Sequence, residues 1–74
     1  MSRELKHWIF NKETGSVVAE VYNDPRFNNG DMISTSKIVD IKDDIITTSS
    51  GTLYVLKESY VSSKKDIEEY LKRL

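Results

Sequence analysis

The sequence predicts a mainly β (α+β) fold: a small five-stranded antiparallel curled sheet or open barrel with one C-terminal helix. Short runs of β-branched and aromatic residues, each bounded by turn-forming residues, predict the strands. Apolar residues change to helical spacing only near the C-terminus. A chain of 74 residues holds one domain. We therefore expect a single domain over residues 1–74, with a β region over 5–62 and a helix over 63–74.

The expected strands are separated by short turns. The first two form an antiparallel hairpin around a turn that ends in Gly15, where a positive φ is available. Pro25 and the pair Asn29-Gly30 mark an irregular loop over 23–31, and residues 32–36 are not assigned to a strand. The five predicted strands span 6–11, 16–22, 37–42, 45–49 and 52–57.

The terminal helix is predicted by an apolar stripe at positions i, i+3, i+4 and i+7, formed by Ile67, Tyr70, Leu71 and Leu74. Ser63 is the expected N-cap, and Asp66 three residues later completes a capping-box pattern. An isolated helix of this length is marginal in water, so it must dock on a sheet.

Composition and charge exclude several classes of protein. The 11 basic and 12 acidic residues give a net charge of −1, which argues against nucleic-acid binding. The absence of cysteine excludes a disulfide scaffold, a thiolate metal site and a cysteine nucleophile. No apolar run is long enough for a membrane span or a signal peptide, so we expect no membrane partner and a cytoplasmic location.

The small size also favours assembly. Domains of this length seldom gain much stability from one core, and this chain has neither a disulfide nor an evident metal site to supplement it. Either the fold is very economical or the core extends across a subunit interface. We expect a homo-oligomer.

No pattern for catalysis or metal binding is present. Glycines at 15, 30 and 51 cannot form a phosphate loop or a dinucleotide fingerprint. His7 is the only imidazole, and we expect it to be a surface or half-buried strand residue. Asp43-Asp44, with Asp40 upstream, does not match a calcium loop and is expected to be a solvated turn. We therefore expect no catalytic residue, no metal and no cofactor, and a protein that is not an enzyme.

Hydroxyl-rich segments around two predicted turns suggest an anion-binding site. Hydroxyl groups and turn amides donate hydrogen bonds to phosphate oxygens, a guanidinium pairs with phosphate, and aromatic rings stack on a base. The alternative is ordinary turn and strand chemistry, because serine and threonine are common in both. The candidate ligand-binding residues are Arg26, Phe27, Thr35, Ser36, Ser50, Thr52 and Tyr54.

The segment 25–56 also resembles a pattern in short proteins of phages and mobile elements. That pattern joins a Pro-Arg-Phe loop, a glycine turn, a Thr-Ser pair before a strand and a Ser-Gly hairpin before an aromatic residue. This chain carries it as Pro25-Arg26-Phe27, Gly30, Ile33, Thr35-Ser36-Lys37-Ile38, Thr48, Ser50-Gly51-Thr52 and Tyr54-Val55-Leu56, under half of its length. Small phage proteins of this kind look like inhibitors of host defence. Some bind defence enzymes, and others sequester cyclic-nucleotide signals as oligomers.

Two functional hypotheses follow. The first is a non-catalytic phage-type protein that sequesters a small anionic, nucleotide-like signal, for example a cyclic nucleotide, in the host cytoplasm. The second is an inhibitor or adaptor that binds a host protein directly, with Trp8, Phe27 and the helix face as anchors. A module for single-stranded nucleic acid and an enzyme are weaker alternatives.

Overall fold

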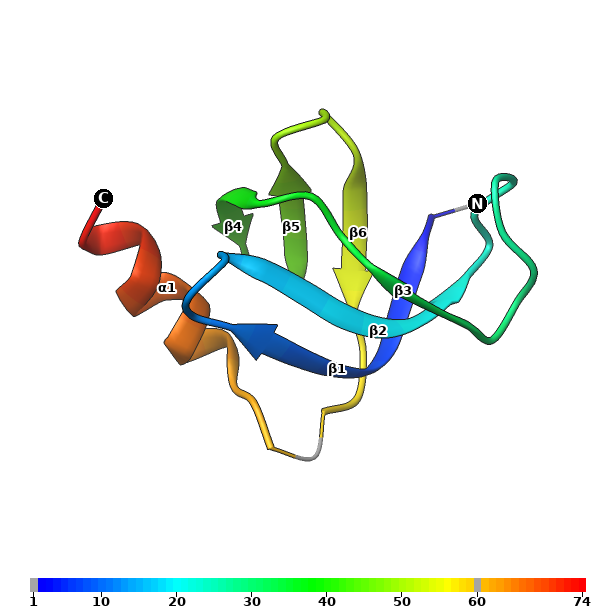
Figure 1. Cartoon of the computed structure of the whole chain (residues 1–74), viewed down its shortest axis with the longest axis horizontal. Helices are drawn as coiled ribbons and strands as arrows, with labels where there is room; N and C mark the ends of the chain where they lie inside the picture. Colours follow the sequence, from blue (N-terminus) through cyan, green and yellow to red (C-terminus); the bar gives the residue numbers. More distant parts are fainter. Residues whose placement is uncertain (1, 60) are drawn as a thin grey trace.

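Six strands and one helix form the described part of the chain, residues 2–59 and 61–74 of a computed structural model (Figure 1). The mainly β class, the curled sheet and the C-terminal helix are confirmed, but the sheet has six strands and is mixed. The elements are β1 (Glu4–Asn11), β2 (Ser16–Tyr22), β3 (Asp31–Ser34), β4 (Ile38–Lys42), β5 (Ile45–Thr48), β6 (Leu53–Leu56) and α1 (Lys64–Lys72).

The strand order β3-β2-β1-β6-β5-β4 shows two antiparallel meanders that are joined side by side. The joining pair, β1 and β6, is parallel, so the expectation of a wholly antiparallel sheet was wrong. Glu4 lies opposite Val55 and Leu5 opposite Leu56. The bonds run from Val55 N to the carbonyl of Arg3 at 2.8 Å, and from Lys57 N to that of Leu5 at 2.9 Å.

The sixth strand, β3, lies where the sequence predicted loop and unassigned residues. Gly30 adopts a φ of 91° and donates its N–H to the carbonyl of Val21 at 2.8 Å, which turns the chain back along β2. Four residues then pair with β2, from Val21 opposite Asp31 to Val18 opposite Ser34. A strand this short, with two polar residues among four, carries too little alternation to be recognised.

A bulge in β1 sets which of its side chains enter the core. Lys6 pairs with Glu20 and Ile9 with Val18, so two residues of β1 oppose one residue of β2. His7 takes up the irregularity with a φ of 52°. Because of this shift, Trp8 is buried while its neighbour Ile9 faces outward. The buried apolar residues are Leu5, Trp8, Phe10, Val17, Ala19, Val21, Ile38, Ile46, Tyr54, Leu56 and Ile67.

The helix docks at one end of the molecule, beside β4 and the β1–β2 turn (Figure 1). Ser63 is the N-cap, as predicted, and its N–H donates to the Asp66 carboxylate at 3.2 Å. Ile67 is fully buried, and Tyr70 meets the edge of the Phe10 ring at a centroid distance of 5.4 Å. The helix ends at Lys72, so the expectation that Leu74 continues its stripe was wrong.

Leu74 lies beyond the helix end and is 71% exposed. The expected extent of 63–74 is thus shortened at the C-terminus. Among the described residues, no helix has the length and apolar character needed to span a membrane.

Candidate functional site

The loop between β2 and β3 begins with a tight turn over residues 24–27. The N–H of Phe27 donates to the carbonyl of Asp24 at 3.0 Å, and Pro25 holds the second position, where its fixed φ suits such a turn. The N–H of Arg26 donates to Asp24 Oδ1 at 3.0 Å. An aspartate that bonds the backbone two residues on is a local and favourable arrangement. The turn therefore places the Asp24 carboxylate and the Arg26 side chain together.

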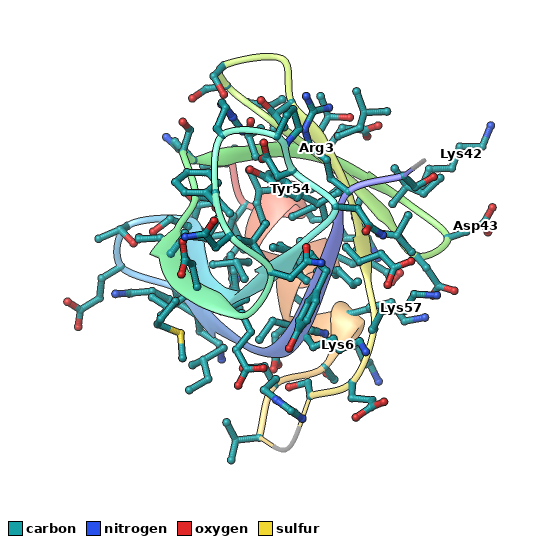
Figure 2. The ribbon with its side chains drawn as sticks, turned by 90° about the vertical axis from the view of Figure 1, so that its right-hand side faces the viewer. Arg3, Lys6, Lys42, Asp43, Tyr54 and Lys57 are labelled. Atoms are coloured by element: carbon teal, nitrogen blue, oxygen red, sulfur yellow. The ribbon has the colours of Figure 1, made fainter. Side chains whose placement is uncertain are left out.

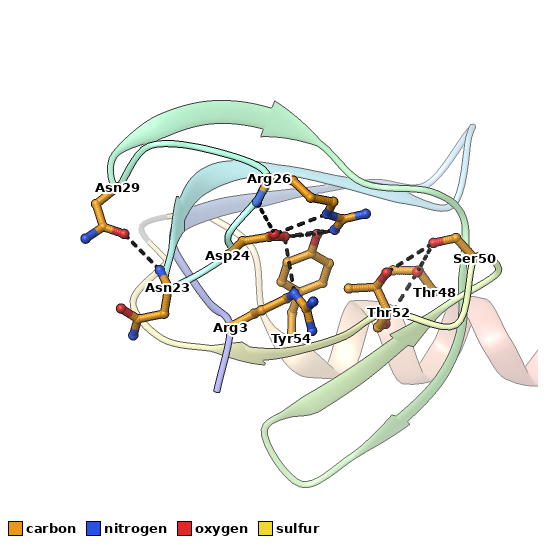
Figure 3. A network of polar contacts seen from close by, with 9 residues as sticks. All are labelled: Arg3, Asn23, Asp24, Arg26, Asn29, Thr48, Ser50, Thr52 and Tyr54. Atoms are coloured by element: carbon orange, nitrogen blue, oxygen red, sulfur yellow. Dashed lines mark hydrogen bonds and ion pairs between the residues drawn. The ribbon is translucent and has the colours of Figure 1, made fainter. Parts of the chain in front are cut away.

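The Asp24 carboxylate has no exposed surface and is shared by two arginines. Arg26 donates from Nε to Oδ1 at 3.1 Å and from Nη2 to Oδ2 at 2.8 Å, a bidentate pair. Arg3 approaches from the segment just before β1, with its Nε 3.4 Å from Oδ2, and the Tyr54 hydroxyl donates to Oδ2 at 3.3 Å. We call Arg3, Asp24, Arg26 and Tyr54 the Asp24 cluster (Figure 3).

The charges of this cluster do not cancel. The hydrogen bonds from Arg26 hold the pKa of Asp24 well below its usual range, and the charge of Arg3 adds to the effect. One carboxylate therefore faces two guanidinium groups, which leaves one net positive charge. The side chains of Arg26 and Arg3 are 52% and 38% exposed, so this charge is accessible to solvent.

A second group of polar side chains gathers at the β5–β6 turn. Ser50 Oγ lies 2.9 Å from Thr48 Oγ1, 3.4 Å from Thr52 Oγ1 and 3.4 Å from Ser36 Oγ. The turn itself is closed by the N–H of Gly51, which donates to the carbonyl of Thr48 at 2.9 Å. We call Ser36, Thr48, Ser50 and Thr52 the hydroxyl cluster.

The two clusters share one face of the sheet. Thr52 and Tyr54 are two residues apart on an extended segment, so their side chains point to the same side. Arg3 and Tyr54 lie next to each other in two views of the molecule (Figures 2 and 3). In Figure 3 the guanidinium of Arg26 lies between Asp24 and the hydroxyl cluster. Cationic nitrogens and hydroxyl donors therefore lie on the same face of the curled sheet.

The structure sorts the predicted site residues into different surroundings. Ser36, Ser50 and Thr52 meet in the hydroxyl cluster, while Arg26 and Tyr54 meet in the Asp24 cluster. Phe27 is 39% exposed, and its ring centroid lies 5.5 Å from the Arg26 guanidinium carbon. Arg26, Phe27 and the exposed members of the hydroxyl cluster, Ser36 and Ser50, are thus accessible, whereas Thr48 is buried.

Two predicted residues have other surroundings. Thr35 is buried; its Oγ1 accepts from the Val17 N–H at 3.0 Å and donates to the Ser36 carbonyl at 2.8 Å. These bonds tie the end of β3 to β2, so Thr35 serves the sheet. Tyr54 is only 3% exposed, so it offers no ring face for a base. Its hydroxyl accepts from Arg26 Nη2 at 3.0 Å.

Sequence reasoning missed three members of these clusters. Asp24 carried a usable signal, because aspartate before proline is typical of this turn. Thr48 was assigned to a strand and lies at its end, where its side chain points inward. Arg3 had no signal, because only the β1–β6 pairing brings it beside Tyr54.

A further polar group surrounds His7 on the outer face of β1 and β2. His7 Nδ1 lies 3.1 Å from Glu20 Oε2, and Nε2 lies 3.6 Å from Glu58 Oε2. Tyr22 donates its hydroxyl to Glu20 Oε1 at 2.9 Å. The bond from His7, and then that from Tyr22, lowers the pKa of Glu20. We call His7, Glu20, Tyr22 and Glu58 the His7 cluster. His7 is half-buried, at 32% exposure of its side chain, as predicted.

Within residues 2–59 and 61–74, no three or more histidine, aspartate or glutamate side chains are arranged to hold a metal ion. Comparison of the chain with protein-family models, with curated proteins and with solved structures gives no match. The assignment of function therefore depends on the geometry of the clusters and on the sequence.

Proposed function

We propose that this protein is a non-catalytic binding protein that holds a small anionic, nucleotide-like ligand at the Asp24 and hydroxyl clusters. One observation carries the proposal: two partly exposed guanidiniums share one buried carboxylate beside a group of hydroxyl donors. The spare positive charge attracts an anion, and the hydroxyls supply hydrogen bonds that a phosphate group accepts.

The geometry suits a ligand with a phosphate and an aromatic base. Arg26 Nη1 makes no hydrogen bond to any described residue and is the nitrogen that a phosphate oxygen would meet. Ser50 and Thr52 would donate from the hydroxyl cluster. Phe27, exposed and stacked beside Arg26, offers a ring for a base. The bidentate bond to Asp24 fixes the guanidinium in advance, which reduces the entropy lost on binding.

The resemblance of segment 25–56 supplies the biological setting. Proteins that carry such a pattern look like inhibitors of host defence, and some of them sequester cyclic-nucleotide signals. We propose the same purpose for this chain, in the host cytoplasm: the ligand is held unchanged and withdrawn from signalling.

Calorimetry against a panel of cyclic dinucleotides, cyclic trinucleotides and ADP-ribose derivatives tests the proposal. We expect at least one ligand to bind wild-type protein at tens of micromolar and to be recovered intact. Arg26→Gln and Ser50→Ala should each weaken binding by about tenfold, since a charged or phosphate-directed hydrogen bond contributes about 1.5 kcal/mol.

Matched controls exist elsewhere in the chain. Thr14 and Ser16 form a hydroxyl pair at 2.7 Å in the β1–β2 turn, and Arg73 caps the helix C-terminus. Ser16→Ala and Arg73→Gln should leave affinity unchanged. No heat with any ligand in the panel, or equal losses in site and control variants, would refute the proposal.

A second candidate function is supported by a groove on the other side of the sheet. The groove has a volume of about 640 Å³ and is lined partly by Ile9, Val18 and Val61, which are 51%, 36% and 76% exposed. Exposed apolar side chains in a groove are typical of protein-binding sites. The expected anchor Trp8 is buried, at 3% exposure, so it does not belong to this surface.

A pull-down from host lysate separates the two functions. Direct inhibition of a host protein predicts a stoichiometric partner that survives Arg26→Gln and Ser50→Ala but is lost in Val18→Glu. Ligand sequestration predicts no such partner.

A further inference from the structure

Strands β5 and β6 carry large apolar side chains on both faces. Their inner face carries the buried residues Ile46, Thr48, Tyr54 and Leu56. Their outer face carries Ile45, Thr47, Leu53 and Val55, of which Ile45 and Leu53 are 42% and 53% exposed. An antiparallel sheet with one face in water normally presents polar side chains there. The outer face of β5 and β6 instead has the composition of a face that is covered.

This outer face has a ridge between two hollows. Ile45 and Leu53 line both a hollow of about 180 Å³ and a hollow of about 360 Å³. Arg3 and Val55 border the first, and Asp40 and Lys42 border the second. When two copies of such a surface face each other, the apolar ridge of each copy can fit into a hollow of the other.

The register of the strands shows one row on this face whose end charges are self-complementary. Lys42 pairs with Ile45, Ile45 with Val55 and Val55 with Glu4, so these residues form one row across β4, β5, β6 and β1. Across these four strands the row begins with a cation, ends with an anion and is apolar between them; beyond Glu4 it continues to Tyr22 of β2. A two-fold axis parallel to the strands reverses the row and sets each Lys42 against a Glu4 of the partner subunit.

We propose that two copies of this chain pack sheet against sheet through the outer face of β5 and β6. Sheets packed face to face lie about 10 Å apart, with the apolar side chains of both faces interleaved between them. Ile45 of one protomer then lies over Val55 of the partner subunit, and the flanking charges form ion pairs. A two-fold interface requires this kind of self-complementarity.

The small core makes a second copy the fitting occupant. A domain of this size without a disulfide gains stability when its exposed apolar face becomes part of a larger core. In a two-fold dimer the two ends of the row must carry opposite charges, as Lys42 and Glu4 do. A different protein as partner would not require this relation between the two ends. The inference concerns assembly and does not depend on a ligand at the Asp24 cluster.

Sedimentation velocity and native mass spectrometry of the full chain test the interface. We expect wild-type protein to be a dimer at micromolar concentration, and Leu53→Glu to be a monomer with a wild-type circular dichroism spectrum. Met32, 63% exposed on β3, gives the matched control, and Met32→Glu should remain dimeric. A wild-type monomer at hundreds of micromolar would overturn the proposal, as would a dimeric Leu53→Glu.

Charge reversal keeps the proposal testable if Leu53→Glu fails to fold. Lys42→Glu and Glu4→Lys should each weaken dimerisation by about tenfold, because each change is repeated twice in a two-fold dimer. The double variant should restore wild-type affinity. Loss in both single variants without restoration in the double variant would refute this arrangement of the two copies.

Discussion

The Asp24 cluster and the His7 cluster each place one side chain between two others and include a tyrosine, but the chemical types of the central and flanking groups are exchanged. In the first, a carboxylate lies between two cations and accepts from a tyrosine. In the second, an imidazole lies between two carboxylates, one of which accepts from a tyrosine. The Asp24 side chain has no exposed surface, whereas His7, Glu20 and Glu58 are 32%, 28% and 69% exposed. Because a buried ion pair is less screened by water than an exposed one, we expect the Asp24 cluster to contribute more to stability than the His7 cluster.

The backbone conformation at Asp24 is also more favourable than that at His7. Asp24 sits in an aspartate–proline turn that its side chain reinforces. His7 sits in a β-bulge with a φ of 52°, a conformation that costs energy for a residue with a Cβ. The local structure thus supports the first cluster and works against the second.

Asp24→Asn should cause the largest loss of stability. The change leaves two guanidiniums beside an uncharged amide and removes charge-assisted hydrogen bonds, each of which contributes about 1.5–3 kcal/mol. We expect a loss of roughly 2–3 kcal/mol, near the lower bound for a buried pair because both arginines are partly exposed. Urea denaturation measures it. Asp31→Asn, which alters an exposed carboxylate at the start of β3, should change the midpoint little; equal effects would contradict the prediction.

Protonation of Asp24 should be the main cause of the loss of folding stability at low pH. The pKa of Asp24 is lower in the folded state than its unfolded value of about 3.9. Its stabilisation is therefore complete above that value and is lost as the pH falls toward the folded pKa. Between about pH 5 and pH 2, wild-type protein should lose stability more steeply than Asp24→Asn.

Denaturation curves at stepped pH values measure this slope. Glu20 and Asp44 also have lowered pKa values, so Asp24→Asn should retain a residual slope in the same direction. If unfolding free energy fell with pH equally steeply in the two proteins, the acid sensitivity would come from groups other than Asp24.

Arg26→Lys should give an intermediate effect. Lysine keeps the positive charge but cannot form the bidentate bond through Nε and Nη2. The denaturation midpoint should shift by about half the shift of Asp24→Asn, since the charge remains while the fork is lost. The matched change Arg73→Lys should have no measurable effect. If Arg26→Lys had the denaturation midpoint of the wild type, the positive charge without the bidentate bond would be sufficient to stabilise the Asp24 cluster.

The contrast between the clusters also explains what the sequence could predict. Local signals were sufficient for the β1–β2 hairpin, the Ser63 N-cap and the two tight turns that surround the hydroxyl residues. They could not place Arg3 beside Tyr54, because this contact depends on a parallel pairing between chain segments about 50 residues apart. The short strand β3 was missed because its pairing depends on the Gly30 turn. Of the seven expected ligand-binding residues, two lie in the Asp24 cluster, three in the hydroxyl cluster and one, Thr35, in the sheet, while Phe27 is exposed beside Arg26; this division is a tertiary effect.

His7→Gly should have the smallest effect on stability. Glycine adopts a φ of 52° without the cost that a Cβ imposes, so the substitution relieves the bulge. It also removes the contacts with Glu20 and Glu58, but these side chains are partly exposed, so water weakens the contacts. The two changes oppose one another, and the denaturation midpoint at neutral pH should stay close to that of the wild type. His7→Ala is the informative companion, because alanine loses the contacts and keeps the strain, so it should be less stable than His7→Gly. If both variants were as unstable as Asp24→Asn, the His7 contacts would have to contribute as much as a buried ion pair, and burial would no longer distinguish the two clusters.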